Sequence, residues 1–426
     1  MKRILITVVI SLIGLSAEAK TVYVNNAMGD DHFTGEREDF DVVEAGPVRT
    51  IARATQLANW GDTISLADTN VPYQECISLN NKKGSGINAN YPFILEGNGA
   101  VLDGRVTVEP KHWEHFKEIY KNVENKEPEY QGDVFRLHIA RLYPYAVCNC
   151  MLFIDSAPIQ NKEIAPMESP VGNLNEMDAA LYDGYLYFRP EKGKTPEDYK
   201  LQITALRTGI TLYHTDHVVI RNLIIQGFQL DGVALTNSAT NVVIQQCTIR
   251  GNARAGISIG QGSDVQIKNI LACANAKSEI LTLPYCRVVV EKSKLTGDYG
   301  APWVDVSGNE HGSAALFSNN GKWIKPSELK PDLTPLPDAQ DAVKEFNDDD
   351  DDANTDVAAD TDDDNADAAD ADGADSDVNA NDDGATDDAF GTDDNADDDG
   401  FGSNNADDNN ADDNPFNTED NPFNLE

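Results

Sequence analysis

Four nonapeptides decide the fold of this chain: VVIRNLIIQ at residues 218–226, VVIQQCTIR at 242–250, VQIKNILAC at 265–273 and VVVEKSKLT at 288–296. Each begins 23 or 24 residues after the one before it. Apolar residues recur in three columns with this spacing. The columns contain Ile210, Val233, Ile257 and Ile280; Ile220, Ile244, Ile267 and Val290; and Ile225, Ile249, Ala272 and Leu295. The chain therefore carries an internal repeat of three short apolar segments.

A repeat of this length has room for three short strands and none for a helix. Its apolar faces can be buried only if successive turns of the chain coil and stack on one another. The sequence therefore predicts an all-β protein whose main domain is a parallel β-helix, which is a solenoid. The three columns would form its core, because strand side chains point inward at alternate positions.

The first 19 residues predict that the protein is exported. Two basic residues precede an apolar run over residues 4–15, and Ala17-Glu18-Ala19 follows, as in a secretory signal peptide. We therefore expect a secreted mature protein, which is extracellular, periplasmic or held at the cell surface. No later run approaches the roughly 18 to 20 apolar residues of a membrane-spanning helix, so no membrane span is expected.

The net charge of the chain is concentrated in its C-terminal tail. The formal net charge is -40, and residues 347–426 hold 31 of the 73 acidic residues and no Lys or Arg. The tail is poor in large apolar residues, so it cannot repay the entropy of ordering and is predicted to be disordered. A Pro-rich linker is expected at 326–346. Neither the polyanionic tail nor the mildly acidic body suits nucleic-acid binding.

The acidic tail has several candidate roles. Clusters such as Asp382-Asp383-Gly384 resemble loose calcium-binding sequences, because Ca²⁺ prefers oxygen ligands, but they lack the positional order of an EF-hand loop. We expect a solubilising or cell-wall-facing spacer. The alternatives are weak Ca²⁺ uptake and a sorting function of the two terminal Asn-Pro-Phe motifs. No metal ligand is assigned in the folded body.

Several segments outside the repeat resemble those of a known family. They are Tyr23-Val24 with a following Gly/Asp loop, Arg49-Thr50-Ile51, Gly61-Asp62-Thr63-Ile64, and Tyr91-Pro92-Phe93-Ile94-Leu95 with Val101-Leu102-Asp103-Gly104. With the repeat, they resemble the exported right-handed parallel β-helix proteins of the pectate-lyase-like superfamily. The resemblance implies a right-handed solenoid over residues 20–325, closed at its first turn by an N-terminal cap. It also implies a tight corner at Asn222 and Asn269, where asparagine side chains stack along the axis.

The repeat is interrupted between residues 105 and 198. This stretch has a mixed composition that includes Gly184-Tyr185-Leu186-Tyr187, and it is too long for a structureless loop. We therefore predict an inserted β-rich subdomain over 105–198. Similar insertions that end in a Gly-x-Leu-Tyr strand occur in carbohydrate-active members of the superfamily. The resemblance implies that this insertion leans over one side of the solenoid.

The six cysteines leave the disulfide pattern open. Cys247 occupies the position of aliphatic residues in neighbouring repeats, so we expect it to be a small buried hydrophobe. Cys148 and Cys150 could pair with Cys76 or with each other.

One edge of the predicted solenoid carries a row of basic residues. Arg207, Arg254 and Lys277 each lie three residues before an inward residue of the first column. Successive turns rise by about 4.8 Å, so these side chains would be spaced at intervals that suit a sugar chain. We predict that they bind substrate, because guanidinium and ammonium groups bind carboxylates and sulfates. The alternative is ordinary solvated charge on turns.

The same edge offers candidate catalytic residues. After Ile280 the spacing lengthens, with about eleven residues added between Leu295 and Ala314. The added segment contains Trp303, Asp305, Glu310 and His311. An aromatic side chain can support a sugar face, and carboxyl and imidazole groups can move a proton. The alternative role of this segment is to cover the last turn of the solenoid.

Two chemistries fit an enzyme of acidic polysaccharides. A β-eliminating lyase needs a cation to neutralise the uronate carboxylate, which Arg254 or Lys277 could supply, and a base, which His311 could supply. A glycoside hydrolase needs two carboxyl groups. The candidate acids are Asp231, Asp305 and Glu310. The spacing does not select between these chemistries.

Two classes of function are therefore open. The first is a monomeric protein that binds an acidic polysaccharide, with or without cleaving it, and that has no certain cofactor. The second is a non-catalytic cell-envelope or adhesive protein that uses the solenoid as a rigid spacer. Both rest on analogy with the superfamily, because a fold of this kind serves many activities.

Overall fold

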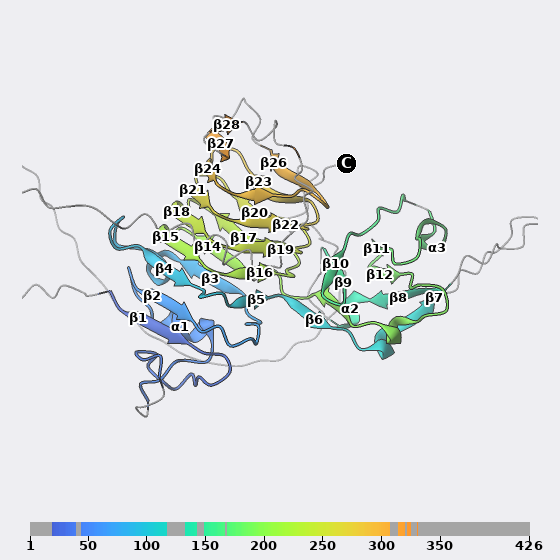
Figure 1. Cartoon of the computed structure of the whole chain (residues 1–426), viewed down its shortest axis with the longest axis horizontal. Coiled ribbons are helices and arrows are strands. Elements are labelled where there is room, and N and C mark those ends of the chain that lie inside the picture. Colours follow the sequence, from blue (N-terminus) through green and yellow to red (C-terminus); the bar gives the residue numbers. More distant parts are fainter. Residues whose placement is uncertain are drawn as a thin grey trace, which may run out of the picture. The chain divides into compact units, whose positions relative to one another are not determined.

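The computed structural model describes residues 19–39, 44–116, 133–142, 149–166, 168–306, 314–319, 322–324 and 330. Its central feature is a stack of strands in which each turn of the chain contributes to three sheets (Figure 1). The predictions for residues 1–18 of the signal peptide, for Glu310 and His311, and for the acidic tail at 347–426 lie outside the described residues.

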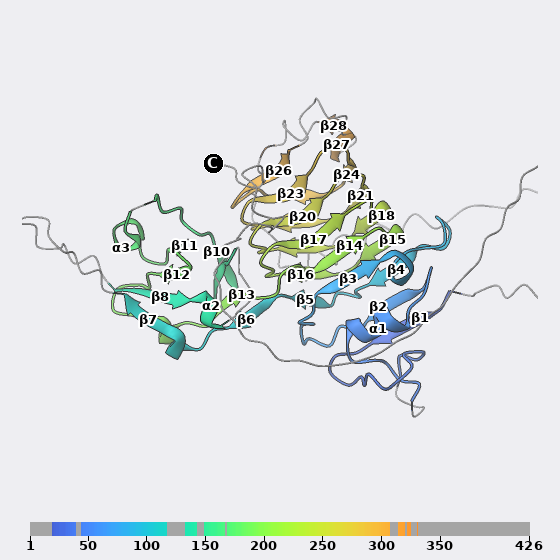
Figure 2. The same ribbon diagram turned by 180° about the vertical axis from the view of Figure 1, so that it is seen from behind.

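Three sheets form the walls of the solenoid, and Figure 2 shows their strands stacked in the same order from behind. The nine-stranded sheet contains β1 (Thr21–Val24), β2 (Thr63–Leu66), β4 (Phe93–Glu96), β15 (Asp216–Arg221), β18 (Thr240–Gln245), β21 (Asp264–Lys268), β24 (Arg287–Glu291), β27 (Ala314–Asn319) and β28 (Lys322–Ile324). The six-stranded sheet contains β3 (Ile77–Asn80), β14 (Ile210–Tyr213), β17 (Asp231–Thr236), β20 (Ala255–Ile259), β23 (Ser278–Thr282) and β26 (Ala301–Asp305). The five-stranded sheet contains β5 (Val101–Asp103), β16 (Ile224–Gln226), β19 (Thr248–Arg250), β22 (Leu271–Cys273) and β25 (Lys294–Leu295). Within these sheets only the last pair, β27 with β28, is antiparallel.

The strand register confirms the three predicted columns. In the six-stranded sheet Val233 pairs with Ile210 on one side and Ile257 on the other. The other two columns pair in the same way between successive turns. Every member of the three columns is at most 3% exposed. The parallel β-helix is therefore the architecture that the 23-residue spacing predicts.

The tight corner implied by the resemblance is present, but the side-chain ladder lies elsewhere. Asn222, Gln246, Asn269 and Lys292 all have a left-handed backbone, with φ between 45° and 54°. Asparagine adopts this conformation more readily than most residues. The Asn222 amide, however, donates to Glu96 Oε1 on the preceding turn at 2.8 Å and not to an equivalent asparagine.

The asparagine ladder occupies the corner between the five-stranded and six-stranded sheets. Asn252 Oδ1 accepts from the backbone N–H of Phe228 at 3.0 Å, and Asn275 Oδ1 accepts from the backbone N–H of Asn252 at 3.0 Å. Both asparagines are completely buried. These amides satisfy backbone donors that the sharp corner would otherwise leave without partners.

The N-terminal segment covers the first turn of the solenoid, as predicted. Helix α1 (Ile51–Leu57) begins at Thr50, whose hydroxyl accepts from the backbone N–H of Arg53. Ile51 and Ala54 face the core and are fully buried. A covered end protects the apolar interior and the strand edges of a solenoid from association with other chains.

The stretch between β5 and β14 forms two further sheets and two short α-helices. Its strand-rich character agrees with the predicted β-rich insertion, although its last strand lies beyond the predicted end at residue 198. One sheet contains β6 (Arg105–Thr107), β13 (Leu201–Thr204), β9 (Leu152–Ile154) and β10 (Ala157–Ile159). The other contains β7 (Trp113–Phe116), β8 (Val134–His138), β12 (Tyr185–Phe188) and β11 (Ala179–Tyr182). The helices are α2 (Ile139–Leu142) and α3 (Pro170–Asn173). All strand pairs here are antiparallel, in contrast to the solenoid. We call this region the insert.

The described cysteines are free thiols. Cys247, Cys150, Cys273 and Cys286 are buried, and Cys76 is exposed. Cys247 is 1% exposed within the main core, which confirms its predicted role as a small apolar residue. Cys148 lies outside the described residues.

Candidate functional site

The predicted basic residues lie on successive turns at one edge of the solenoid. Backbone hydrogen bonds join the turns: Leu230 N–H donates to Arg207, Arg254 N–H to Leu230 and Lys277 N–H to Arg254. The side chains of Arg207 and Lys277 are exposed, whereas Arg254 is half-buried. The chain leaves the solenoid for the insert after β5 and returns before β14, so the insert is attached at this same edge.

A small apolar cluster joins the insert to the basic edge. Met151 and Phe153 of the insert pack with Ala253, and the partly buried Ala276 and Tyr299 pack against this cluster. Ala253, Ala276 and Tyr299 lie 23 residues apart, on successive turns. The insert therefore leans over this side of the solenoid, as the resemblance implied.

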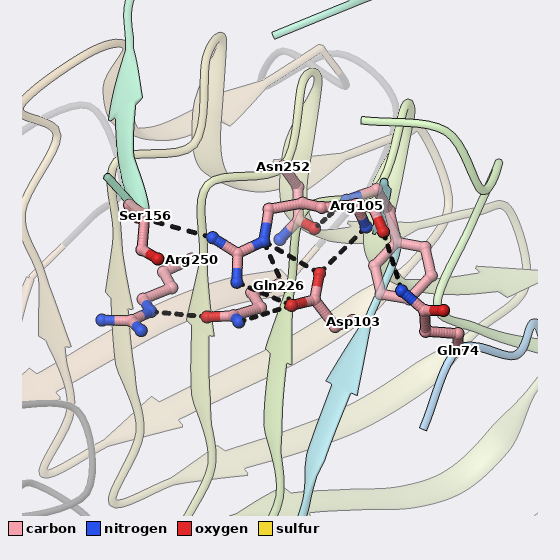
Figure 3. Close-up of polar contacts among 8 residues, drawn as sticks. Gln74, Asp103, Arg105, Ser156, Gln226, Arg250 and Asn252 are labelled. Atoms are coloured by element: carbon pink, nitrogen blue, oxygen red, sulfur yellow. Dashed lines mark hydrogen bonds and ion pairs between the residues drawn. The ribbon is translucent and has the colours of Figure 1, made fainter. Parts of the chain in front are cut away.

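A buried ion pair fixes the base of the insert, where the chain departs from β5 (Figure 3). Asp103 accepts from Arg105 Nε at 2.9 Å and from Nη2 at 2.6 Å, and Gln226 Nε2 donates to the same carboxylate at 2.9 Å. The Arg105 guanidinium also lies 4.9 Å from the centre of the Phe153 ring. Asp103 and Arg105 are 6% and 7% exposed. This cluster is therefore an anchor and not a surface for a ligand.

A glycine makes room for this anchor. Gly227 has φ +75°, and a Cβ at this position would lie 2.2 Å from Arg105 Cγ. The sequence carries a visible signal in Asp103-Gly104-Arg105, but the pairing depends on how the chain turns out of the solenoid. Asp103 and Gly104 belong to a segment quoted for the family resemblance, and Arg105 is the first residue of the predicted insertion.

Asp231 and Arg254, predicted as catalytic acid and substrate ligand, bind each other. Arg254 Nε donates to Asp231 Oδ1 at 2.9 Å, Arg254 Nη2 contacts Asp231 Oδ2, and Ser258 Oγ donates to Oδ2 at 2.7 Å. Asp231 is completely buried. The reason is the solenoid repeat: residues 23 apart lie on adjacent turns, so opposite charges at that spacing meet. Asp231 is thus placed as an anchor for Arg254 and is closed off from solvent.

Trp303 differs from its predicted place as an exposed platform. It pairs with Ile280 in the six-stranded sheet, which makes it the next member of the first apolar column, and it is 6% exposed. Its indole N–H donates to Thr282 Oγ1 at 3.1 Å. The 23-residue step continues through Trp303, and extra residues fall after Asp305, since Val290 pairs with Phe317. The structure describes none of residues 307–313.

Asp305 ends β26 and is exposed. Its Oδ1 accepts from the hydroxyl of Thr282 at 3.0 Å. Asp231 lies at the opposite end of its own strand, three turns away, so the structure does not bring the two predicted acids together. Glu310 and His311 are not among the described residues, and their predicted roles stay predictions.

A polar recess lies where the insert meets the basic edge, and sequence analysis missed it. The recess has a volume of about 380 Å³ and is lined by Ile159, Gln160, Asn161, Lys162, Asn175, Asp178 and Tyr299. Six of these seven residues come from the insert and Tyr299 from the solenoid. The one signal that could have indicated it is an aromatic residue at 299, where the two preceding repeats have alanine.

Contacts across the recess hold its two walls together. The Tyr299 hydroxyl donates to the backbone oxygen of Pro158, and Gln160 Nε2 donates to the backbone oxygen of Tyr299. Lys162 Nζ lies 3.4 Å from Asp178 Oδ2. Burial and the neighbouring Asp298 raise the pKa of the Tyr299 phenol, so the hydroxyl remains a donor at neutral pH. Amide, ammonium, carboxylate and phenol groups are the kinds of side chain that bind sugar hydroxyls.

The turn that carries Tyr299 is tied to a buried carboxyl group. Glu279 is completely buried, and its Oε1 accepts from the Gly297 N–H and hydrogen-bonds with the Thr296 hydroxyl, both at 3.2 Å. Burial, with a smaller contribution from Asp298, raises the pKa of Glu279 to about 8. This side chain is therefore mostly protonated at neutral pH.

The described residues show no metal site and no membrane helix. In the part of the chain that the structure describes, no three or more His, Cys, Asp or Glu side chains converge to hold a metal ion. No helix among those residues is both long and apolar enough to cross a membrane. The acidic tail, where weak Ca²⁺ binding was the alternative prediction, is outside this region.

One protein-family model matches the solenoid. A family model described as "Right handed beta helix region" matches residues 208–321. Among solved structures the chain is similar to XylC in complex with xylose, with 12% identity, a TM-score of 0.33 and coverage of 67% of this chain and 68% of that one. It is also similar to a protein titled "Glycoside hydrolase", with 11% identity, a TM-score of 0.38 and coverage of 65% and 73%. A periplasmic alginate epimerase, AlgG, has 15% identity, a TM-score of 0.24 and coverage of 27% and 31%.

No match to the chain is found among curated proteins. The structural similarities are too distant to transfer an activity. The family match over residues 208–321 and the stacked parallel turns show a right-handed parallel β-helix, which is the fold that the sequence resemblance implied.

We predict that Arg254→Met lowers the free energy of unfolding by about 3 to 5 kcal/mol, because it leaves the buried Asp231 charge without its cation. The measurement is urea unfolding of the purified protein. Lys277→Met is the matched control, since the exposed Lys277 should change stability by less than about 0.5 kcal/mol. Equal, small effects of both changes would contradict the structural role of the Asp231–Arg254 pair.

We also predict that stability falls with rising pH because of Glu279. The folded state holds this proton up to about pH 8, whereas the unfolded chain releases it near its ordinary pKa of 4.5. The stabilisation is therefore complete below the unfolded value and is lost as the pH rises through about 8. Melting temperatures measured from pH 5 to 9 should decline less in Glu279→Gln than in the unaltered protein; parallel declines would contradict the assignment.

Proposed function

We propose that this protein binds polysaccharide in the polar recess and along the adjoining basic edge. The observation that carries the proposal is the recess itself. It is a hollow of about 380 Å³ with a tyrosine wall and side chains that donate and accept hydrogen bonds. Its size falls within the range of small-ligand sites.

The recess suits a sugar better than an apolar ligand. Of its lining residues only Ile159 is aliphatic, while Asn175 and Gln160 carry exposed amides and the Asn161 amide donates to the backbone oxygen of Cys150. An amide can donate to one hydroxyl and accept from another, which matches the mixed donors and acceptors of a sugar ring. The Tyr299 ring offers an apolar surface for the C–H face of the sugar.

The basic edge would extend the site toward an acidic chain. Arg207 and Lys277 are exposed on turns that stack beside the insert, whereas Arg254 is partly neutralised by Asp231. Because only two of the three predicted cations are exposed, we expect the protein to prefer acidic glycans but also to bind neutral ones. Export is part of the proposal, and it rests on the signal peptide predicted at residues 1–19.

Binding without cleavage is the form of the proposal that the described residues favour. Of the predicted catalytic groups, Asp231 is buried in an ion pair. Asp305 lies three turns away from Asp231, at the opposite end of its own strand. This arrangement also suits the alternative of a non-catalytic cell-envelope or adhesive protein. Cleavage by a lyase or a hydrolase would depend on Glu310 or His311. The binding experiments must therefore also measure cleavage of the polysaccharide.

Replacing Tyr299 by alanine should lower affinity for a bound polysaccharide roughly tenfold, because it removes the aromatic wall. Affinity would be measured by calorimetry with the mature full chain and a panel of neutral and acidic polysaccharides. Tyr285→Ala is the matched control, since Tyr285 is a tyrosine exposed to 62% on the turn between β23 and β24. Unchanged affinity in Tyr299→Ala, with a normal melting temperature, would place the site elsewhere.

Replacing Arg207 and Lys277 together by alanine should weaken binding of acidic polysaccharides and spare neutral ones. The loss should shrink at high salt, because exposed charges are screened. Unsaturated uronate absorbance and new reducing ends would be followed in the same samples. Either product would establish cleavage, and binding without product would support the non-catalytic form. No binding by any polysaccharide would refute the proposal.

A further inference from the structure

One interior position changes its chemistry at the turn next to the recess. In two earlier turns this position is Gly232 and Gly256. A Cβ at Gly256 would lie only 2.9 Å from Asn275 Nδ2, so glycine leaves room for the asparagine ladder. In the following turn the same position is Glu279, and the asparagine position becomes Asp298. Two carboxyl groups thus replace a glycine and an amide.

Glu279 and Asp298 share one hydroxyl group. Thr296 Oγ1 lies 3.2 Å from Glu279 Oε1 and also contacts Asp298 Oδ1. A hydroxyl carries a single proton, so Thr296 cannot donate to both carboxylates at once. When Glu279 is protonated, its own O–H can donate to Thr296, which then donates to Asp298. The Glu279 proton therefore completes a chain of two hydrogen bonds, from Glu279 to Thr296 and from Thr296 to Asp298.

The other partners of Glu279 do not replace that proton. Asn275 Nδ2 contacts Glu279 Oε2, and the Gly297 N–H donates to Oε1 at 3.2 Å. Cys273 on β22 also faces Glu279, and burial raises the pKa of this thiol to about 12, so it stays neutral. Loss of the Glu279 proton would therefore set a buried anion next to the exposed carboxylate of Asp298.

The corner is linked directly to the recess. Thr296 and Gly297, which bond to Glu279, lie in the turn that ends at Tyr299. Tyr299 in turn contacts the insert through its hydroxyl on Pro158 and through its backbone oxygen on Gln160. A shift of this turn would move the solenoid wall of the recess relative to the insert wall.

We propose that protonated Glu279 is a positioning residue that holds the turn of Thr296 to Tyr299 and so keeps the polar recess in its binding form. The proposal rests on the proposed function for its effect on polysaccharide affinity. The claim that Glu279 holds the turn of residues 296–299 in place does not depend on the proposed function. The protein would then bind its glycan with a strength that depends on the protonation of a residue that the glycan does not touch.

The sign of the effect follows from the chain of hydrogen bonds. Glycan affinity should be constant from about pH 6 to 7 and should fall roughly five- to tenfold by about pH 9.5, which is within the range expected for loss of one ordinary hydrogen bond. Glu279→Gln keeps a donor and an acceptor at the same place without a charge. Its affinity should remain near the neutral value at both pH values.

The test pairs affinity with a measurement that needs no glycan. Hydrogen–deuterium exchange of the peptide that covers residues 296–300, corrected for the intrinsic pH dependence of exchange, reports whether the turn loosens. We expect protection to fall above about pH 8 in the unaltered protein and to persist in Glu279→Gln. Glu96→Gln is the control, because Glu96 binds Arg221 at another corner and should leave both profiles unchanged.

The outcomes separate the two proposals. Constant protection of residues 296–300 at all pH values would overturn the positioning role. A loosened turn with unchanged affinity would overturn the link to the recess. If no glycan binds at any pH, the proposed function fails, and the exchange profile then decides alone whether Glu279 positions the turn.

Discussion

The structure depends on the hydrogen-bonded stacking of one turn of the chain on the next. Parallel pairing places residues that are 23 or 24 apart in sequence beside one another, at the roughly 4.8 Å spacing of neighbouring strands. A side chain inside the solenoid is therefore packed mainly between its equivalents in the turns before and after. Equivalent interior positions therefore form columns, and the side chains of one column must suit their neighbours in the turns above and below. Apolar side chains pack on apolar side chains, and at the corner of Asn252 and Asn275 a side-chain amide accepts from a backbone N–H.

The same stacking pairs charges. Arg254 binds Asp231 and Arg287 binds Asp264, and each pair is separated by 23 residues. A basic residue at the edge of a β-helix must therefore be compared with the residue one repeat away before it is assigned to a ligand. By that comparison the Arg254 guanidinium is already bound by Asp231. A buried, bidentate pair of this kind fixes the geometry of a turn, although its net contribution to stability is limited by the desolvation of both ions.

These constraints explain which predictions from sequence succeeded. The three apolar columns were visible because a column preserves its character from turn to turn, and their register is confirmed. Trp303 was misplaced because its column was continued to Ala314, although the step of 23 residues from Ile280 leads to Trp303 itself. The polar recess could not be predicted. Its residues come from a region without a repeat, and their meeting with Tyr299 depends on how the insert packs on Met151 and Phe153.

The joint between the insert and the solenoid is also where this architecture leaves room for specific chemistry. Within the stack a substitution must suit the turns on both sides, so interior columns change little. At residues 296–300 the turn faces the insert, which Tyr299 contacts through Pro158 and Gln160. An alanine column there ends in Tyr299, a glycine column ends in Glu279 and an asparagine column ends in Asp298. Three columns that change character together at one turn, beside a polar hollow, are hard to explain by core packing, because a buried glutamate is less favourable there than glycine. The burial of that carboxyl group is therefore better explained by what the turn holds in place than by the stability of the solenoid.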